Sequence, residues 1–344
     1  MTEPVEMDYR LLGNTGLRVS EYALGTMTFG EDWGWGAPES TCRELFEAYA
    51  ETGGNFIDTA NNYTDGSSER IVGDLLADHG REEFVLATKY TLSTRSGDPN
   101  AFGNHRKNLF QAVDASLERL DTDYVDLLWV HTWDTLTPIE ETMRALDDVV
   151  RQGRVHYVGI SDAPAWWVAR AQTLAEERGL TPFAAMQVKY SLAERTVERE
   201  LLPAADALGM GVTAWGPLDG GVLTGKYLEA GDDGRLRQQG REMSEHQRTV
   251  AEAVVEAAEG LDCTPAQVAL AWVREQGTIP ILGATKPAHL ADNLGSLSVE
   301  LTTEVRERLE EAGAVDMGFP MAFLEAETVR SLLFGGTRDR IRRD

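Results

Sequence analysis

The chain has 344 residues, of which 32 are lysine or arginine and 57 are aspartate or glutamate, so its formal net charge at pH 7 is −25. This charge argues against binding to nucleic acid or to an anionic membrane, because both partners call for a basic surface. The hydrophobic share of 42% is enough for a large packed core and argues against a disordered chain.

Short apolar runs alternate with longer segments of helical period along most of the chain. The predicted strands span residues 19–27, 55–60, 84–90, 124–131, 155–161, 184–190, 211–216 and 278–282. The predicted helices span residues 39–51, 67–79, 105–120, 139–152, 163–178, 198–208, 245–258, 265–275 and 287–294. No Gly-x-Gly-x-x-Gly follows any of these strands, which favours a closed (β/α)8 TIM barrel over an open doubly wound sheet. We expect one α/β domain over residues 1–344.

Glycines placed as C-terminal caps mark the ends of five predicted helices, and they are Gly53, Gly80, Gly153, Gly179 and Gly209. Three long segments follow predicted strands, at residues 30–39, 91–104 and 218–244, and these are candidates for the rim of an active site. The C-terminal tail beyond residue 317 carries apolar residues, which predicts that it packs on the barrel.

The sequence favours a cytoplasmic protein without a resident metal. Met1 to Arg10 contain three acidic residues and no apolar core, unlike a signal peptide. No apolar run reaches the roughly 18–20 residues that span a bilayer. Cys42 and Cys263 lie in different predicted helices, so they indicate neither a metal site nor a disulfide framework.

Chemically active side chains gather where three successive predicted strands end. Asp58 and Tyr63 follow the second strand, Lys89 ends the third and His131 ends the fourth. Strand ends of a barrel converge on one bowl, so we expect these groups to meet. Lys89, held by Asp58, should lower the pKa of Tyr63, which could then protonate an oxygen oriented by His131. Taken singly, each residue is more typical of a cap or of packing. Together they fit hydride transfer to or from a carbonyl carbon.

Three strings carry a family resemblance, and they read Asp58-Thr-Ala-Asn-Asn-Tyr63, Phe84-Val-Leu-Ala-Thr-Lys89 and Asp126-Leu-Leu-Trp-Val-His131. In this order the chain resembles the aldo-keto reductase superfamily, and most closely the bacterial branch akin to the β subunits of voltage-gated potassium channels. The resemblance implies a (β/α)8 barrel and a nicotinamide cofactor bound without a Rossmann motif. It also implies that Asp58, Tyr63, Lys89 and His131 form the catalytic tetrad.

The resemblance further implies a set of cofactor contacts. They are Gly25, Thr26, Met27, Asp58, Ser161, Asp162, Gln187, Trp215, Gly216, Pro217, Leu218, Gly221, Lys226, Gly283, Thr285, Lys286, His289, Asp292 and Asn293. Ser161 and Gln187 match positions that hold the nicotinamide carboxamide, and Trp215 matches an aromatic that stacks on the ring. Asp162 stands where the family usually has Asn, and an ionised Asp accepts hydrogen bonds but cannot donate them.

The other end of the cofactor is expected near residues 283–293. Thr285, Lys286 and His289 match positions that meet a 2′-phosphate, which predicts NADP(H), with NAD(H) as the alternative. Asp292 and Asn293 match positions that meet the adenine. Residues 220–226 read Gly-x-x-x-x-Gly-Lys, but Tyr227 follows where a P-loop needs Ser or Thr. The resemblance implies instead that backbone amides of this segment cover the cofactor pyrophosphate.

Five aromatic residues are candidates for the substrate pocket: Phe29, Trp33, Trp35, Tyr90 and Trp133. Such a pocket would suit a sugar-like, aromatic or small apolar carbonyl compound. We therefore expect an NADP(H)-dependent oxidoreductase for small-molecule carbonyl or alcohol substrates. A cofactor-binding redox sensor or regulatory subunit with slow turnover is the alternative. An aldolase using Lys89 as a Schiff base is a third reading, against which the pairing with Tyr63 and the string around Trp215 argue. The oligomeric state is left open.

Overall fold

Our structure is a computed structural model that describes residues 6–228 and 242–342. Its central feature is a closed barrel of parallel strands in the order β10-β3-β4-β5-β6-β7-β8-β9. These strands are β3 (Ala23–Gly25), β4 (Phe56–Asp58), β5 (Val85–Tyr90), β6 (Val125–Val130), β7 (Val155–Ser161), β8 (Phe183–Lys189), β9 (Gly211–Trp215) and β10 (Ile279–Gly283). The predicted (β/α)8 barrel is confirmed.

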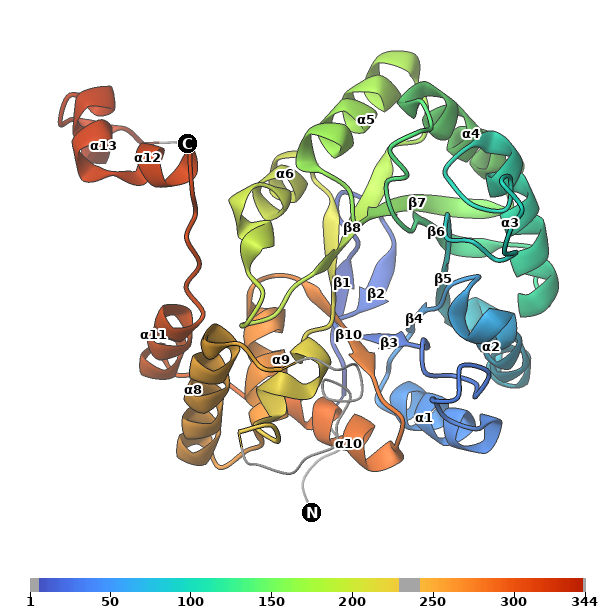
Figure 1. The fold of residues 1–344 in the computed structure, drawn as a ribbon, viewed down its shortest axis with the longest axis horizontal. Helices are drawn as coiled ribbons and strands as arrows, with labels where there is room; N and C mark the ends of the chain where they lie inside the picture. The colour runs from blue at the N-terminus through green and yellow to red at the C-terminus, as the bar shows by residue number, and fades with distance from the viewer. Residues whose placement is uncertain (1–5, 229–241, 343–344) are drawn as a thin grey trace.

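Helices surround the barrel on its outside (Figure 1). They are α1 (Glu39–Glu51), α2 (Ser67–His79), α3 (Arg106–Leu120), α4 (Ile139–Arg151), α5 (Ala165–Arg178), α6 (Leu201–Ala207), α8 (Glu245–Leu261), α9 (Pro265–Glu275), α10 (Pro287–Gly295) and α11 (Thr303–Ala312). Capping boxes at Ser244 and Thr264 begin α8 and α9. Gly179 ends α5 at a φ of 61°, a conformation that glycine adopts without strain. Helix α11 was not predicted.

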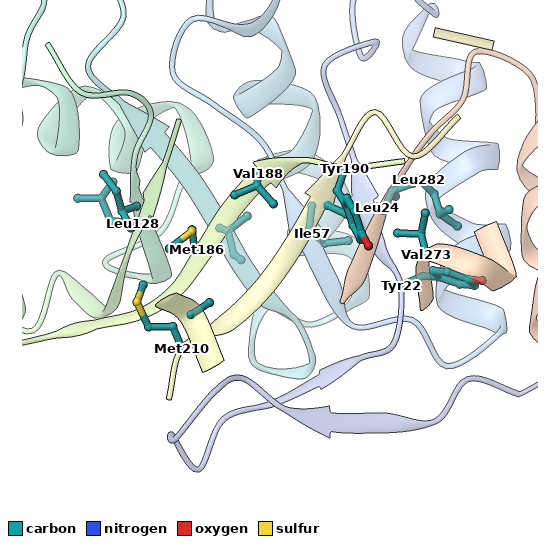
Figure 2. Packing of buried hydrophobic residues seen from close by; sticks show 14 of the residues in the cluster. Tyr22, Leu24, Ile57, Leu128, Met186, Val188, Tyr190, Met210, Val273 and Leu282 are labelled. Atoms are coloured by element: carbon teal, nitrogen blue, oxygen red, sulfur yellow. The ribbon is translucent and has the colours of Figure 1, made fainter. Parts of the chain in front are cut away.

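Alternation along the strands divides the apolar residues between two cores. Outward-facing residues such as Leu24, Ile57 and Leu128 pack against the helices (Figure 2). Inward-facing residues fill the barrel, and the largest of them is the fully buried Trp129. A Cβ atom at Gly159 on β7 would lie 2.3 Å from the Trp129 ring, so the indole uses the space that a side chain at 159 would need.

A hairpin closes the amino-terminal end of the barrel. Its strands are β1 (Tyr9–Leu11) and β2 (Arg18–Ser20), which pair antiparallel. Leu12 and Val19 from this hairpin are fully buried in the barrel core. The Arg10 guanidinium donates to the carbonyl of Thr278, just before β10. The single strand predicted at residues 19–27 is therefore wrong: the chain turns after β2 and enters the barrel as β3.

The C-terminal tail does not pack on the barrel as expected. Its helices α12 (Met321–Glu325) and α13 (Glu327–Phe334) stand apart from the barrel at the end of an extended segment (Figure 1). Among the described residues, the tail is hydrogen-bonded to the body at its root, where the Arg199 guanidinium donates to the carbonyl of Asp316. Phe319 and Leu332 are 86% and 85% exposed. Within residues 6–228 and 242–342, no helix is long and apolar enough to cross a membrane.

Candidate active site

The carboxyl ends of β4 and β5 bring three of the predicted site residues into direct contact. The Lys89 ammonium is buried and donates to Asp58 Oδ2 at 2.5 Å, to the carbonyl of Thr59 at 2.9 Å and to Tyr63 Oη at 3.2 Å. An ammonium has three N–H donors, so all of them are used. Lys89 is therefore fixed as a cation between a carboxylate and a phenol.

Tyr63 sits in a short 3-10 turn directly after β4. The two residues that follow it, Thr64 and Asp65, have φ of 44° and 52°. The Thr64 hydroxyl holds this strained turn by donating to the carbonyl of Phe29 at 2.6 Å and accepting from the amide of Ser68. The turn is tied down on both sides, which fixes the phenol above Lys89.

The pKa values follow from burial and from the neighbouring charges. Burial lowers the pKa of Lys89, but the charges of Asp58 and Tyr63 and the hydrogen bonds to both residues together outweigh it, so the pKa lies above its usual value. Burial raises the pKa of Tyr63, and the opposing effect of Lys89 does not cancel it. Our expectation that Lys89 lowers the pKa of Tyr63 below its usual value is thus wrong, because burial dominates. At neutral pH the phenol keeps its proton.

His131 directly follows β6 and lies beside Tyr63, with the two ring centroids 6.1 Å apart and nearly perpendicular. Burial, reinforced by the charge of Lys89, lowers its pKa to about 3, so the imidazole is neutral at physiological pH. Its Nδ1 is buried and has no hydrogen-bond partner among the described residues. A proton on Nε2 avoids a buried, unpaired N–H, and we assign that tautomer.

The residues expected around the nicotinamide surround the same bowl. Gln187 is buried and its amide donates to Asp58 Oδ1 at 3.0 Å. Ser161 is buried at the end of β7, in register with Gln187. The Trp215 indole donates to Asp162 Oδ1 at 3.1 Å, so the side chain at 162 provides an acceptor that orients the ring. Burial raises the pKa of Asp162, although this hydrogen bond opposes the shift.

Beyond Trp215, the backbone at the carboxyl ends of β9 and β10 borders open space. Gly216, Gly220 and Gly283 have no atom within 4 Å of the position a Cβ would take. Gly216, Gly220 and Gly221 also have positive φ, and two tight turns within the segment are closed by hydrogen bonds from the Asp219 and Gly221 amides. This open cradle fits an extended dinucleotide. Pro217 is buried within it, and Leu218 is half-buried.

The charged residues expected near the phosphates are exposed. Lys226 lies over the ring of Tyr227, with its Nζ 4.9 Å from the centroid. Lys286 caps the start of α10, and His289 lies in its first turn. Thr285 is half-buried beside them. Both lysines are accessible to a phosphate, and the exposed His289 lies close to Lys286 in the sequence, as a 2′-phosphate site requires.

Two residues expected to meet the adenine are engaged within the protein. Asp292 accepts hydrogen bonds from Thr264 and Gln267, which joins α10 to the start of α9. Asn293 is buried, and its carbonyl accepts from Ser296. The contact of Asp292 and Asn293 with the adenine stays a prediction.

The residues at the carboxyl end of β3 also stabilise the fold. Gly25 is buried, and a Cβ there would lie 2.6 Å from the Ile281 side chain. The Thr26 hydroxyl bonds to Ser68 and to the carbonyl of Asp58, so its side chain ties β3 to β4. Met27 is half-buried.

Two of the five aromatic candidates for the substrate pocket do not reach it. Phe29 is fully buried in the core outside the strands. Tyr90 faces the opposite side of β5 from Lys89, and its hydroxyl lies 3.5 Å from the carbonyl of Asn104. Burial raises its pKa, so this phenol stays protonated. Their assignment to the pocket is wrong.

The other three candidates lie at the mouth of the barrel. Trp33 contacts Trp35 and the edge of Tyr63, with centroids 5.4 Å and 6.4 Å away. Trp133 packs edge-on against Trp166, with centroids 5.6 Å apart. The sequence analysis missed Trp166, which is 57% exposed at the start of α5. The signal was its place just after the fifth barrel strand, where a solvent-facing tryptophan is unusual.

Within residues 6–228 and 242–342, no cluster of three or more His, Cys, Asp or Glu side chains could hold a metal ion. Cys42 and Cys263 are free thiols, and burial raises the pKa of both. Neither thiol is an activated nucleophile.

A (β/α)8 barrel with a buried Lys–Asp pair under a protonated tyrosine is the arrangement of a carbonyl oxidoreductase. The model of the aldo/keto reductase family matches residues 22–314, and the chain belongs to this family. It is an oxidoreductase that acts on small-molecule carbonyl or alcohol substrates with a nicotinamide cofactor.

Similar proteins come from fungi. A norsolorinic acid reductase of Aspergillus flavus is 39% identical over 328 residues, which cover 92% of this chain and 84% of the relative. An aryl-alcohol dehydrogenase of Pestalotiopsis microspora is 39% identical over 327 residues, covering 92% and 85%. A putative aryl-alcohol dehydrogenase of Saccharomyces cerevisiae is 36% identical over 335 residues, covering 92% and 89%.

Proposed function

We propose that this enzyme reduces aldehyde or ketone carbonyls with NADPH, or runs the reverse reaction, with Tyr63 as general acid and base. The observation that carries this proposal is the hydrogen bond from Lys89 to the Tyr63 oxygen. Because that oxygen accepts from Lys89, its own hydrogen is left for another acceptor. The phenol is only half-buried, so a substrate oxygen in the bowl can be that acceptor.

The remaining residues prepare this proton transfer. When bound, the cofactor supplies the hydride for the carbonyl carbon. Asp58 keeps Lys89 charged, and Lys89 stabilises the negative charge that develops on Tyr63 as the proton leaves. His131, neutral and protonated at Nε2, donates to the same substrate oxygen and orients it. Ser161, Gln187 and Trp215 hold the cofactor beside them.

The substrate class that we propose is aromatic aldehydes and ketones. Relatives named for an aryl alcohol support this choice. So do the tryptophans at the mouth, since Trp33 contacts both Tyr63 and Trp35, and Trp133 packs against Trp166. Indole rings bind flat aromatic groups through stacked and edge-on contacts.

The cofactor that we propose is NADP(H) rather than NAD(H). Lys286 and His289 are exposed at the start of α10, where they can meet a 2′-phosphate. Replacing Lys286 with Ala should weaken NADPH binding and leave NADH binding nearly unchanged. Lys107→Ala, on the surface of α3, is the matched control. Equal losses for both cofactors would contradict the assignment.

Three finer predictions accompany this function. We expect a single domain over residues 1–344, a cytoplasmic location, and a place in the bacterial branch akin to potassium-channel β subunits, although the relatives above come from fungi. The Schiff-base alternative is disfavoured by geometry. Lys89 uses all three N–H groups and its pKa is raised, so it lacks the free lone pair of a nucleophile.

The deciding experiment is NADPH oxidation with a panel of aromatic, sugar and dicarbonyl aldehydes, with wild type and Tyr63→Phe side by side. Turnover that depends on Tyr63 and is fastest with aromatic members is the expected result. Tight NADPH binding with a single burst and no turnover would favour the sensor or regulatory alternative. Failure to bind either nicotinamide cofactor would contradict the proposal.

A further inference from the structure

A second lysine enters the bowl from β8. Lys189 is two residues beyond Gln187 and therefore lies on the same inward face of the strand. It pairs in register with Trp215 on β9, and its Nζ lies 6.0 Å from the centroid of that indole ring. The side chain is 33% exposed. None of the roles assigned above uses this cation.

The partner of Lys189 is a carboxylate that the protein largely buries. Asp219 is 9% exposed and follows the turn at the end of β9. Its Oδ1 lies 3.3 Å from the Lys189 ammonium, and its Oδ2 accepts from the Gln247 amide at 2.5 Å. Within residues 6–228 and 242–342, the cation that forms an ion pair with Asp219 is Lys189.

The position of Asp219 creates an electrostatic problem. It belongs to the segment from Gly216 to Gly221, in which Gly216 and Gly220 leave open space above the backbone. In the proposed function this cradle receives a cofactor diphosphate. A carboxylate in the same segment repels the diphosphate, and the repulsion is strongest where water is excluded. A nearby cation can cancel that charge.

We propose that Lys189 is a positioning residue of the cofactor site, which neutralises Asp219 and holds the segment 216–221 in a form that accepts a diphosphate. This inference rests on the proposed function. Lys189 acts through Asp219 and the backbone of the segment. The chain thus carries two lysines with separate tasks in one bowl: Lys89 serves the proton transfer, and Lys189 serves binding.

A double-mutant cycle measured as equilibrium NADPH binding, by quenching of tryptophan fluorescence, tests this idea. Lys189→Met should weaken NADPH binding by about tenfold or more, because it leaves a carboxylate unpaired beside the phosphates. Asp219→Asn should bind as well as wild type or better. The double variant should recover binding to within a few-fold of wild type, and Lys107→Met should bind normally.

Two fragments locate the effect along the cofactor. 2′-Phosphoadenosine 5′-diphosphoribose retains the diphosphate without the nicotinamide, and Lys189→Met should weaken its binding as much as that of NADPH. Adenosine 2′-monophosphate lacks the diphosphate and should bind both proteins equally.

Three results would overturn the inference. They are unchanged NADPH binding by Lys189→Met, a double variant that stays as weak as Lys189→Met, and a loss that is equal for adenosine 2′-monophosphate. The second would mean that Lys189 touches the cofactor directly. If wild type binds no nicotinamide cofactor at all, the proposed function itself fails. If wild type binds and Lys189→Met binds equally, only the role of Lys189 fails.

Discussion

The two ends of the barrel differ in what fills them. At the amino end, Leu12 and Val19 from the β1–β2 hairpin seal the interior with apolar side chains. At the carboxyl end, the same interior is lined by Asp58, Lys89 and Gln187, which bond to one another. The strands are continuous between the two ends, so a position's depth along its strand decides whether it serves stability or chemistry.

The largest effect on turnover should come from a substitution at the mouth of the barrel. Tyr63→Phe removes one hydroxyl that donates to nothing in the described protein, and it leaves the ring in place. We expect kcat for carbonyl reduction to fall about 100- to 10,000-fold, the usual contribution of a general acid. NADPH affinity and the urea midpoint should stay near wild type. A kcat within a few-fold of wild type would mean that another group supplies the proton.

Lys89→Met should affect both chemistry and stability, because Lys89 contacts Tyr63 and also balances the buried charge of Asp58. Removing it leaves Asp58 buried and unpaired, which typically costs about 3–5 kcal/mol of unfolding free energy. Adding Asp58→Asn should restore much of the stability but none of the turnover. Urea unfolding together with steady-state kinetics on both variants measures the split. Recovery of turnover in the double variant would contradict the role of Lys89.

A substitution at the amino end of the barrel should show the opposite behaviour, with lower stability and unchanged turnover. Leu12→Ala opens a cavity at a fully buried position and should lower the unfolding free energy by about 2–5 kcal/mol. We expect kcat below the unfolding temperature to be unchanged, since Leu12 lies at the far end of the strands from Tyr63. A parallel fall in kcat would show that the two ends are coupled.

The pH dependence of the unfolding free energy tests the carboxyl end of the barrel through His131. Its folded pKa of about 3 lies below the ordinary value of 6.5, so as pH falls below about 6.5 the unfolded chain takes up a proton that the folded one refuses. The stabilising contribution is therefore complete above that pH and is lost on acidification. Between about pH 7 and pH 4, wild type should lose more unfolding free energy than His131→Asn. Equal losses in the two proteins would contradict the low pKa.

The smallest effect is expected at Asp162. Asn in its place can still accept from the Trp215 indole and can also donate to a carboxamide. We expect Asp162→Asn to tighten NADPH binding by about 3- to 10-fold, the value of one net hydrogen bond. Asp162→Ala, which removes the acceptor, should weaken it. Titration by fluorescence quenching distinguishes the three proteins.

The sequence predicted most of the barrel because each strand and helix carries its own period. The prediction failed where the hydrophobic period of a segment does not reveal how the segment packs in the folded chain. The hairpin residue Val19 and the barrel residue Ala23 read as one apolar run, although the chain turns between them. Helix α11 was also missed, because few apolar residues mark it. The separation of the tail from the barrel was missed because no local sequence pattern determines it.

The candidate site was predicted in the same uneven way. The meeting of Asp58, Tyr63 and Lys89 followed from strand ends, which sequence locates well. Tyr90 was misplaced although the signal was available, since a neighbour of the inward-facing Lys89 must face outward. The same reasoning identifies Lys189 from Gln187. Phe29 could not be placed from sequence, because a bridge between it and Ala37 folds its loop inward.

The contact between Trp129 and Gly159 limits how this barrel can change. A methyl group at 159 would lie 2.3 Å from the indole, so no larger side chain can enter position 159 while Trp129 keeps its place. An alanine at 159 would require a smaller side chain at 129, and the original indole would exclude any residue but glycine from β7 at that level. The two positions form a unit that must be exchanged together. Anyone redesigning the interior should therefore search them jointly rather than one at a time.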